Sequence, residues 1–211
     1  TSPPDQKLEW SDSAVEGSSR YLKRLWRMVF DHVAAGPAPA LAGLDLSDEE
    51  ASLRRITHQT IAKVSDDVGR RYTFNTAIAT VMELTNAVQK LAGDSDSSRA
   101  VRGEAIDTIV ALLSPIVPHV THTLWSALGH EGPVVDAAWP QVDEAALVSD
   151  SIDMVVQVNG KLRGKISVLT EAPKNAVEAA ALANADVQRF VGDKDIRRVI
   201  VVPGKLVNVV V

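Results

Sequence analysis

The sequence contains no cysteine, and this absence excludes several classes of protein. Disulfide-stapled scaffolds, cysteine-ligated zinc ribbons, iron–sulfur clusters and thiol nucleophiles all need a residue that the chain lacks. The 211 residues are 45% hydrophobic and 23% charged, which is typical of a globular protein long enough to bury a core.

Long hydrophobic runs are missing as well. No apolar stretch reaches the roughly 18 residues needed to span a bilayer, and no charged-then-apolar leader opens the chain. We therefore expect no membrane partner. The chain begins with Thr1 rather than methionine, which predicts that it is part of a longer polypeptide.

The two parts of the chain carry opposite charge. The net charge of −5 argues by itself against a nucleic-acid partner, but it hides an asymmetry. Residues 1–150 carry 13 basic and 21 acidic side chains, whereas residues 151–211 carry nine basic and six acidic ones. The amino-acid composition changes at the same place, from rich in Ala, Leu, Glu and Arg to rich in Val. The pattern predicts two domains, 1–148 and 152–211, joined near 149–151.

Hydrophobic residues at three- and four-residue spacing predict five helices in the first domain. Ser47 and Glu50 have the spacing of a capping box, in which each side chain bonds the other's backbone amide. The predicted ranges are about 13–35, 48–70, 74–93, from Ser97 or Ser98 to about 114, and 115–128. Short connections between such helices favour a bundle.

The second domain changes to a period of two residues, which is typical of strands. Met154–Val158 and Leu162–Val168 flank Asn159-Gly160, a strong hairpin signal. We predict a three-residue loop with Gly160 left-handed, because that register places Val156 opposite Leu162 and keeps the apolar residues on one face.

A helical segment and a second hairpin complete this domain. Pro173 is a plausible helix start, and the apolar pattern that follows it ends at Gly192. Arg197–Val202 and Leu206–Val211 are predicted strands. The predicted fold class is mainly α with a small α+β domain, a helix bundle followed by a ββ-α-ββ module.

Metal-binding and acid–base motifs are weak. His119 and His122 could supply two metal ligands, with His130 nearby, but no second cluster completes a tetrahedral site. Acidic pairs at 66–67 and 94–96 would serve a hydrolase only if they shared a cleft, and solvated helix faces explain them more simply. We expect no catalytic and no metal-binding residue in this chain.

Basic residues are better candidates for a binding site. Four of them repeat at i, i+3, i+4 and i+7 of the first predicted helix: Arg20, Lys23, Arg24 and Arg27. Three more alternate along one strand and so should share a face, and three from the other hairpin could extend that patch: Lys161, Arg163, Lys165, Arg197, Arg198 and Lys205. Such spacing suits a row of phosphates. The alternative is an ordinary solvated face, and with only Phe190 nearby we expect no base stacking at the second set.

Five segments carry a resemblance to a known family. Three segments resemble the helical anticodon-binding domain of class I aminoacyl-tRNA synthetases: SRYLKRLWRMVFDHV (19–33), HQTIAKVSDDVGRRYTFNTAIATVMELTNAVQKL (58–91) and LLSPIVPHVTHTLW (112–125). Within that class they are most similar to the leucyl-tRNA synthetases. The C-terminal domain of the bacterial leucyl enzymes resembles MVVQVNGKLRGKI (154–166) and RRVIVVPGKLVNVVV (197–211). Asn75 also matches a recurrent family motif, where we interpret it as a helix-start or interhelix hydrogen-bonding residue.

The resemblance implies that the chain is the C-terminal portion of a cytoplasmic enzyme that attaches leucine to its tRNA with ATP and magnesium. The H-I-G-H and K-M-S-K-S signatures are absent from this sequence. The resemblance therefore implies that the catalytic and editing domains lie upstream in the same polypeptide, and that the isolated chain is inactive. Its implied partners are leucine tRNA and those domains, with no DNA and no cofactor in this part.

The resemblance also implies where the basic residues act. The six cations of the second domain would face the outer corner of the tRNA, where its D and T loops meet, and the stripe on the first helix would lie along the inner side. The competing interpretation is a structural buttress for the catalytic domain, which the acidic excess of residues 1–150 favours. A third interpretation, after tRNA binding and the buttress, is a free-standing hydrolase.

Overall fold

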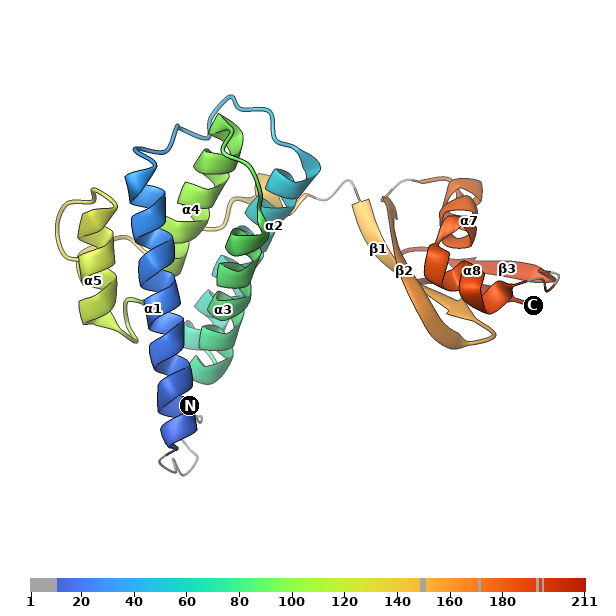
Figure 1. The fold of residues 1–211 in the computed structure, drawn as a ribbon, viewed down its shortest axis with the longest axis horizontal. Helices are drawn as coiled ribbons and strands as arrows, with labels where there is room; N and C mark the ends of the chain where they lie inside the picture. The colour runs from blue at the N-terminus through green and yellow to red at the C-terminus, as the bar shows by residue number, and fades with distance from the viewer. Residues whose placement is uncertain (1–10, 149–150, 171, 193, 195) are drawn as a thin grey trace. The chain divides into compact units, whose positions relative to one another are not determined.

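The computed structural model describes residues 11–148, 151–170, 172–192, 194 and 196–211, which form two compact units (Figure 1). The first unit ends at Leu147 and the second begins at Val148. None of the helices in these described ranges is long and apolar enough to cross a bilayer.

Five long helices build the first unit, as predicted. They are α1 Asp12–Ala34, α2 Asp48–Gly69, α3 Phe74–Lys90, α4 Asp96–Leu113 and α5 Pro118–Ala127, followed by a 3-10 turn Val134–Asp136 and the short α6 Glu144–Leu147. Most residues of α4 are buried, because this helix packs against α2, α3 and α5. The core of the first unit is therefore organised around α4 (Figure 1).

Two helix starts differ from the predicted ones. The fourth helix begins at Asp96, because Ser95 caps it by accepting the Ser98 amide at 3.1 Å. The fifth begins at Pro118 rather than Pro115, since the residue before a proline is disfavoured in the α region and Val117 is accordingly non-helical. Asn75 lies in the first turn of α3, but its side-chain oxygen is buried without a hydrogen-bond partner.

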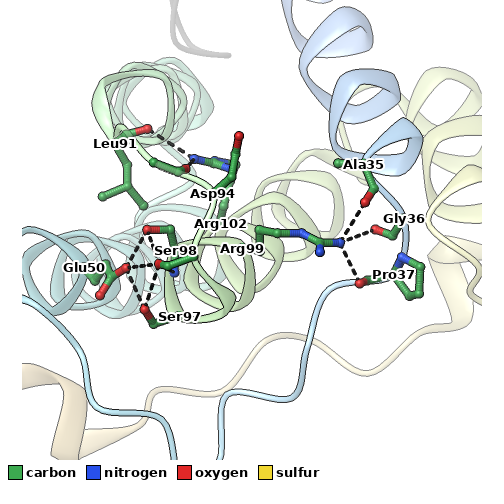
Figure 2. A network of polar contacts seen from close by, with 12 residues as sticks. Ala35, Gly36, Pro37, Glu50, Leu91, Asp94, Ser97, Ser98, Arg99 and Arg102 are labelled. Atoms are coloured by element: carbon green, nitrogen blue, oxygen red, sulfur yellow. Dashed lines mark hydrogen bonds and ion pairs between the residues drawn. The ribbon is translucent and has the colours of Figure 1, made fainter.

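The predicted capping box at the start of α2 is confirmed, and it extends into a polar network (Figure 2). One Glu50 oxygen accepts the Ser47 amide at 2.8 Å, and the other accepts the hydroxyls of Ser97 and Ser98 at 2.8 and 2.5 Å. These bonds, led by that from Ser98, hold the pKa of the Glu50 carboxyl at about 2, below its ordinary value of 4.5. One carboxylate thus joins the starts of α2 and α4.

Two arginines of α4 bind the ends of neighbouring helices (Figure 2). Arg99 donates to three carbonyl oxygens just beyond α1, those of Ala35, Gly36 and Pro37, at 2.8–3.1 Å. Arg102 donates to the Leu91 and Gly93 carbonyls beyond α3. Cations at these positions satisfy carbonyls that a helix end leaves unpaired.

A tertiary network explains why α6 forms although its sequence pattern is too short to predict it. Arg54 of α2 bonds Glu104 at 3.2 Å and Asp143, just before α6, at 2.6 Å. The Arg54 guanidinium lowers the pKa of the Asp143 carboxyl. His58 accepts the Asp143 amide at 3.1 Å and bonds Glu104 at 3.2 Å. The last segment of the first unit is therefore fastened to α2 and α4.

The turn between α2 and α3 holds a tyrosine in an unfavourable backbone conformation. Tyr72 has φ +54°, and its side chain is 62% exposed. The turn is fixed because the Thr73 amide donates to the Asp67 carbonyl at 2.8 Å and its hydroxyl donates to the Asp67 carboxylate at 3.1 Å.

Replacing Tyr72 with glycine is expected to raise the free energy of unfolding by about 0.5 kcal/mol, because relief of the left-handed strain exceeds the extra entropy that glycine loses on folding. Urea unfolding followed by tryptophan emission measures the change. Tyr72→Ala is the control, since it keeps the strain and should gain nothing. A loss of stability in the glycine variant would contradict the prediction.

The second unit is a four-stranded sheet covered on one face by two helices, which confirms the predicted α+β class. Its elements are β1 Ser151–Val158, β2 Lys161–Leu169, α7 Lys174–Ala183, α8 Ala185–Val191, β3 Arg198–Val202 and β4 Leu206–Val210. The strand order is β2-β1-β4-β3, and β1 and β4 pair in parallel. Alternate residues of β1 and β4 are buried against α7 and α8, including Val156 and Val207.

The predicted register of the first hairpin is wrong. Asn159 and Gly160 both have positive φ and form a two-residue turn, so Val156 pairs with Gly164 rather than with Leu162. The register shifts within the hairpin, which leaves Arg163 as an extra residue on β2. This β-bulge keeps the apolar residues together, which the longer loop was predicted to do.

Candidate nucleic-acid interface

The four cations predicted on the first helix are exposed along α1: Arg20, Lys23, Arg24 and Arg27. They lie on the side of the helix opposite the buried Leu25. Arg20 pairs with Glu16 at 3.6 Å, and the Arg24 guanidinium lies 5.6 Å from the centre of the Tyr21 ring. The structure thus brings these four side chains together as one stripe.

The three cations of β2 do not share a face, contrary to the prediction. Lys161 pairs with Val158, whose side chain is buried on the helix-covered face, whereas Lys165 pairs with Val155 on the opposite face. The bulge at Arg163 interrupts the alternation between them. A single added residue therefore divides the predicted row.

Arg163 has a distinct environment beside α8. Its guanidinium carbon lies 3.8 Å from the centre of the Phe190 ring. The adjacent Gly164 allows β2 to lie close to the start of α8, because a Cβ at this position would lie 2.8 Å from the side-chain oxygen of Asn184. That oxygen caps α8. The arginine is thus held over the ring with its N–H donors free of any carboxylate in the described residues.

The second hairpin places its cations at separate points. Arg197 precedes β3, and Arg198 points to the uncovered face because its neighbour in β3, Val199, belongs to the covered one. Lys205 lies in the turn between β3 and β4, where its carbonyl accepts the Val155 amide at 3.4 Å. The three cations therefore follow the border of the sheet.

The face of the sheet that α7 and α8 leave uncovered exposes hydrophobic residues on its two edge strands, β2 and β3. Leu162, Ile200 and Val202 lie on it and are among the exposed large hydrophobic residues. Lys165 lies on β2 and Arg198 on β3, so these cations share the two edge strands with the exposed hydrophobic residues. In place of the predicted continuous basic patch, the uncovered face has separate cations interspersed with exposed hydrophobic residues on its edge strands.

Most of the candidate cations are unpaired, as are Arg55, Lys90, Arg99 and Lys194 among the other basic residues that the structure describes. Within the described part of the chain, Arg20 is the only one of the ten that has a carboxylate partner. Elsewhere, pairs are formed by Arg54, Lys63, Arg70, Arg71, Arg102, Lys174 and Arg189. An unpaired cation can bind a phosphate without first giving up a partner in the protein.

The histidines do not assemble a metal site. His119 and His122 are exposed on α5, whereas His130 bonds Asp107 at 2.9 Å and stacks on Trp125 at 3.7 Å between ring centres. No group of three potential metal-ligating side chains occurs among the residues that the structure describes.

The acidic pair at 66–67 has a structural role. The Asp67 side chain is 1% exposed and binds Lys63, Arg71 and Thr73, and Asp66 pairs with Arg70 on the surface. Two hollows on the described part of the first unit are lined by residues other than these aspartates. The hydrolase alternative required a shared cleft, so it loses its support.

Sequence reasoning missed two exposed aromatic residues. Trp26 and Phe30 fit the apolar repeat of the first helix, yet each is 40% exposed. A helical wheel could have indicated this, because both lie between the buried Leu25 and the cations Lys23 and Arg27.

Comparison with known proteins identifies the family of the chain. The family model described as the anticodon-binding domain of tRNA ligase matches residues 50–178. The chain belongs to this family. The match begins in α2, covers the rest of the first unit and continues into the second.

Within the anticodon-binding family, the chain is similar to leucine–tRNA ligases over nearly all of its length. It is 60% identical over 210 residues to that of Alkalilimnicola ehrlichii and 58% identical over 208 residues to that of Halorhodospira halophila, matching 99% of this chain in both. The chain spans 24% and 26% of these relatives' lengths. The resemblance to the C-terminal portion of leucyl-tRNA synthetases is confirmed.

A solved structure shows the same fold. The LeuRS of Agrobacterium radiobacter, in a ternary complex with tRNA and LeuAMS, matches with a TM-score of 0.72 and 26% identity, over 96% of this chain and 26% of that one.

Proposed function

We propose that this chain is the tRNA-binding and positioning part of a leucine–tRNA ligase. The observation that carries the proposal is that nine of the ten candidate cations have no carboxylate partner among the described residues, in a chain 60% identical to such a ligase. A relative of the same fold was solved with tRNA, which supports an RNA partner.

The cations act through phosphates rather than through base edges. Those of the second unit contact the outer corner of the tRNA, where the D and T loops meet, and the α1 stripe follows the inner side. Folded RNA is recognised mainly through its shape and backbone, which suits cations distributed around a surface. These contacts hold the tRNA so that its acceptor end reaches the reaction sites.

The attachment of leucine to tRNA takes place in the rest of the ligase. The catalytic and editing domains of the same polypeptide supply it, with ATP and magnesium as their cofactors, and this chain alone forms no leucyl-tRNA. Mixing the chain with leucine, ATP, magnesium and leucine tRNA tests this directly, because any charged tRNA would contradict it.

A second candidate function is a buttress that supports the catalytic domain without binding RNA. The acidic excess of residues 1–150 favours this for the first unit. The basic excess of residues 151–211 favours RNA contact for the second. Binding measurements on variants of the second unit distinguish the two.

Replacing Lys165, Arg198 and Lys205 with alanine is expected to weaken binding of a leucine tRNA about ten-fold at low salt. The slope of log affinity against log salt concentration should fall by about 0.7–0.9 for each phosphate that the variant no longer neutralises. The measurement is fluorescence anisotropy of labelled tRNA across a salt series. A parallel Lys161/Arg163 double variant tests the covered side of the sheet.

The matched control removes two cations that already have partners in the same unit. Lys174 pairs with Glu178 and Arg189 with Asp186, so Lys174→Ala with Arg189→Ala should leave both affinity and slope unchanged. Unchanged slopes in all the variants would overturn the proposal for the second unit.

A further inference from the structure

The surface of the first unit has a hollow built around the two unexpectedly exposed aromatic residues. Its volume is about 560 Å³, and α1 supplies all of its lining except one residue of α5. The lining residues are Leu22, Lys23, Trp26, Arg27, Phe30, Asp31 and Val120.

The aromatic pair presents a preformed stacking surface. The rings of Trp26 and Phe30 lie 5.1 Å apart, at 26° to each other, one helical turn apart on α1. Their mutual packing fixes both rings, while 40% of each side chain remains exposed. An exposed pair of large aromatic side chains is informative, because a folded chain ordinarily buries such area.

Two free cations stand beside the rings. Lys23 and Arg27 line the same hollow, and within the described residues neither has a carboxylate partner. Asp31 lies one helical turn beyond Arg27 on α1. The hollow therefore has its cations at one end and its carboxylate at the other. An apolar groove meant for a protein segment would leave both cations without a counterion unless that segment were acidic.

Aromatic faces beside cations match the chemistry of a nucleotide. A base has a π-face that stacks on tryptophan whatever its identity, and its phosphate pairs with lysine or arginine. We propose that this hollow binds one unstacked nucleotide of the tRNA, with the base on Trp26 and the phosphate beside Lys23 and Arg27. The proposal rests on the proposed function and adds base stacking to the phosphate contacts of the α1 stripe.

The test compares Trp26→Leu with Trp26→Phe in the 211-residue chain, with a leucine tRNA transcript as the probe. The leucine variant is expected to bind about ten-fold more weakly, with an unchanged salt slope, because stacking releases no counterions. The phenylalanine variant keeps an aromatic face and should retain most of the affinity. Lys23→Ala with Arg27→Ala should instead reduce the slope.

Tyr72→Leu is the matched control, since Tyr72 is an exposed aromatic residue outside the hollow. A second readout is the tRNA-induced quenching of emission that Trp26→Phe removes. Unchanged affinity in Trp26→Leu, which a protein occupant of the hollow would also give, overturns the inference. The proposed function still stands in that case if the Lys165/Arg198/Lys205 variant binds weakly, and both fall if neither variant changes binding.

Discussion

Replacing Glu50 with alanine is expected to lower the free energy of unfolding of the first unit by about 3 kcal/mol at pH 7. The carboxylate accepts the Ser47 amide and the hydroxyls of Ser95, Ser97 and Ser98. Hydrogen bonds to a charged group contribute more than neutral ones, and the loss leaves the buried Ser98 hydroxyl without its acceptor. The capping box at the start of α2 is lost as well.

The contribution of Glu50 should depend on pH in a defined window. Its pKa is about 2 in the folded chain against an ordinary 4.5, so the folded state favours the ionised form. The resulting stability is fully present above about pH 4.5 and is lost as the pH falls towards 2. Glu50→Gln resembles the protonated acid and does not titrate. The wild type should therefore be more stable than this variant above about pH 4.5 and should lose that advantage as the pH falls towards 2.

Urea unfolding followed by tryptophan emission measures this effect in the first unit alone, because all four tryptophans of the sequence lie before residue 148 and the second unit has none. Glu49→Ala is the matched control, since Glu49 is the exposed neighbour in the same helical turn. Equal losses in the two alanine variants would show that the network does not stabilise the bundle.

Replacing Asp67 with alanine is expected to cost about 2–3 kcal/mol of unfolding free energy. The buried carboxylate binds Lys63 at 2.8 Å and Arg71 and Thr73 at 3.1 Å. Removing a buried charged acceptor is costly, but both cations are about half exposed and can regain water. The turn into α3 also loses the bond that positions Thr73.

The adjacent Asp66 provides the control for this prediction. It forms an exposed i,i+4 pair with Arg70, and such pairs add little to stability, so Asp66→Ala should unfold nearly as the wild type does. Asp67→Asn keeps an acceptor for the Thr73 hydroxyl and should lose less than the alanine variant. The same denaturation assay applies, and a loss at Asp66 as large as that at Asp67 would contradict the assignment.

Local signals predicted most of the fold. The capping box formed by Ser47 and Glu50 starts α2 where it was predicted, because its bonds join residues only three apart. The period of 3.6 residues located the long helices, since a helix that buries one side must repeat in this way. Asn159-Gly160 predicted the position of the first hairpin. Each of these features depends on neighbours along the chain.

The binding surface was predicted less well. The basic residues were identified by their spacing, but the bulge at Arg163 separated Lys161 from Lys165. The contact of Arg163 with Phe190 joins residues that are 27 positions apart, and no local pattern indicates it. Trp26 fits the apolar repeat of the first helix and is nevertheless exposed, because periodicity alone does not show how wide a strip the neighbouring helices cover.

Composition, periodicity and short-range hydrogen bonding thus decide the long helices and the strands of this chain and that it has two parts. Packing decides the rest: the parallel pairing of β1 with β4, the burial of Asp67 and the exposure of Trp26. These features depend on contacts between residues distant in the chain. Their free energies are set by the area and partners that each side chain finds after the elements meet.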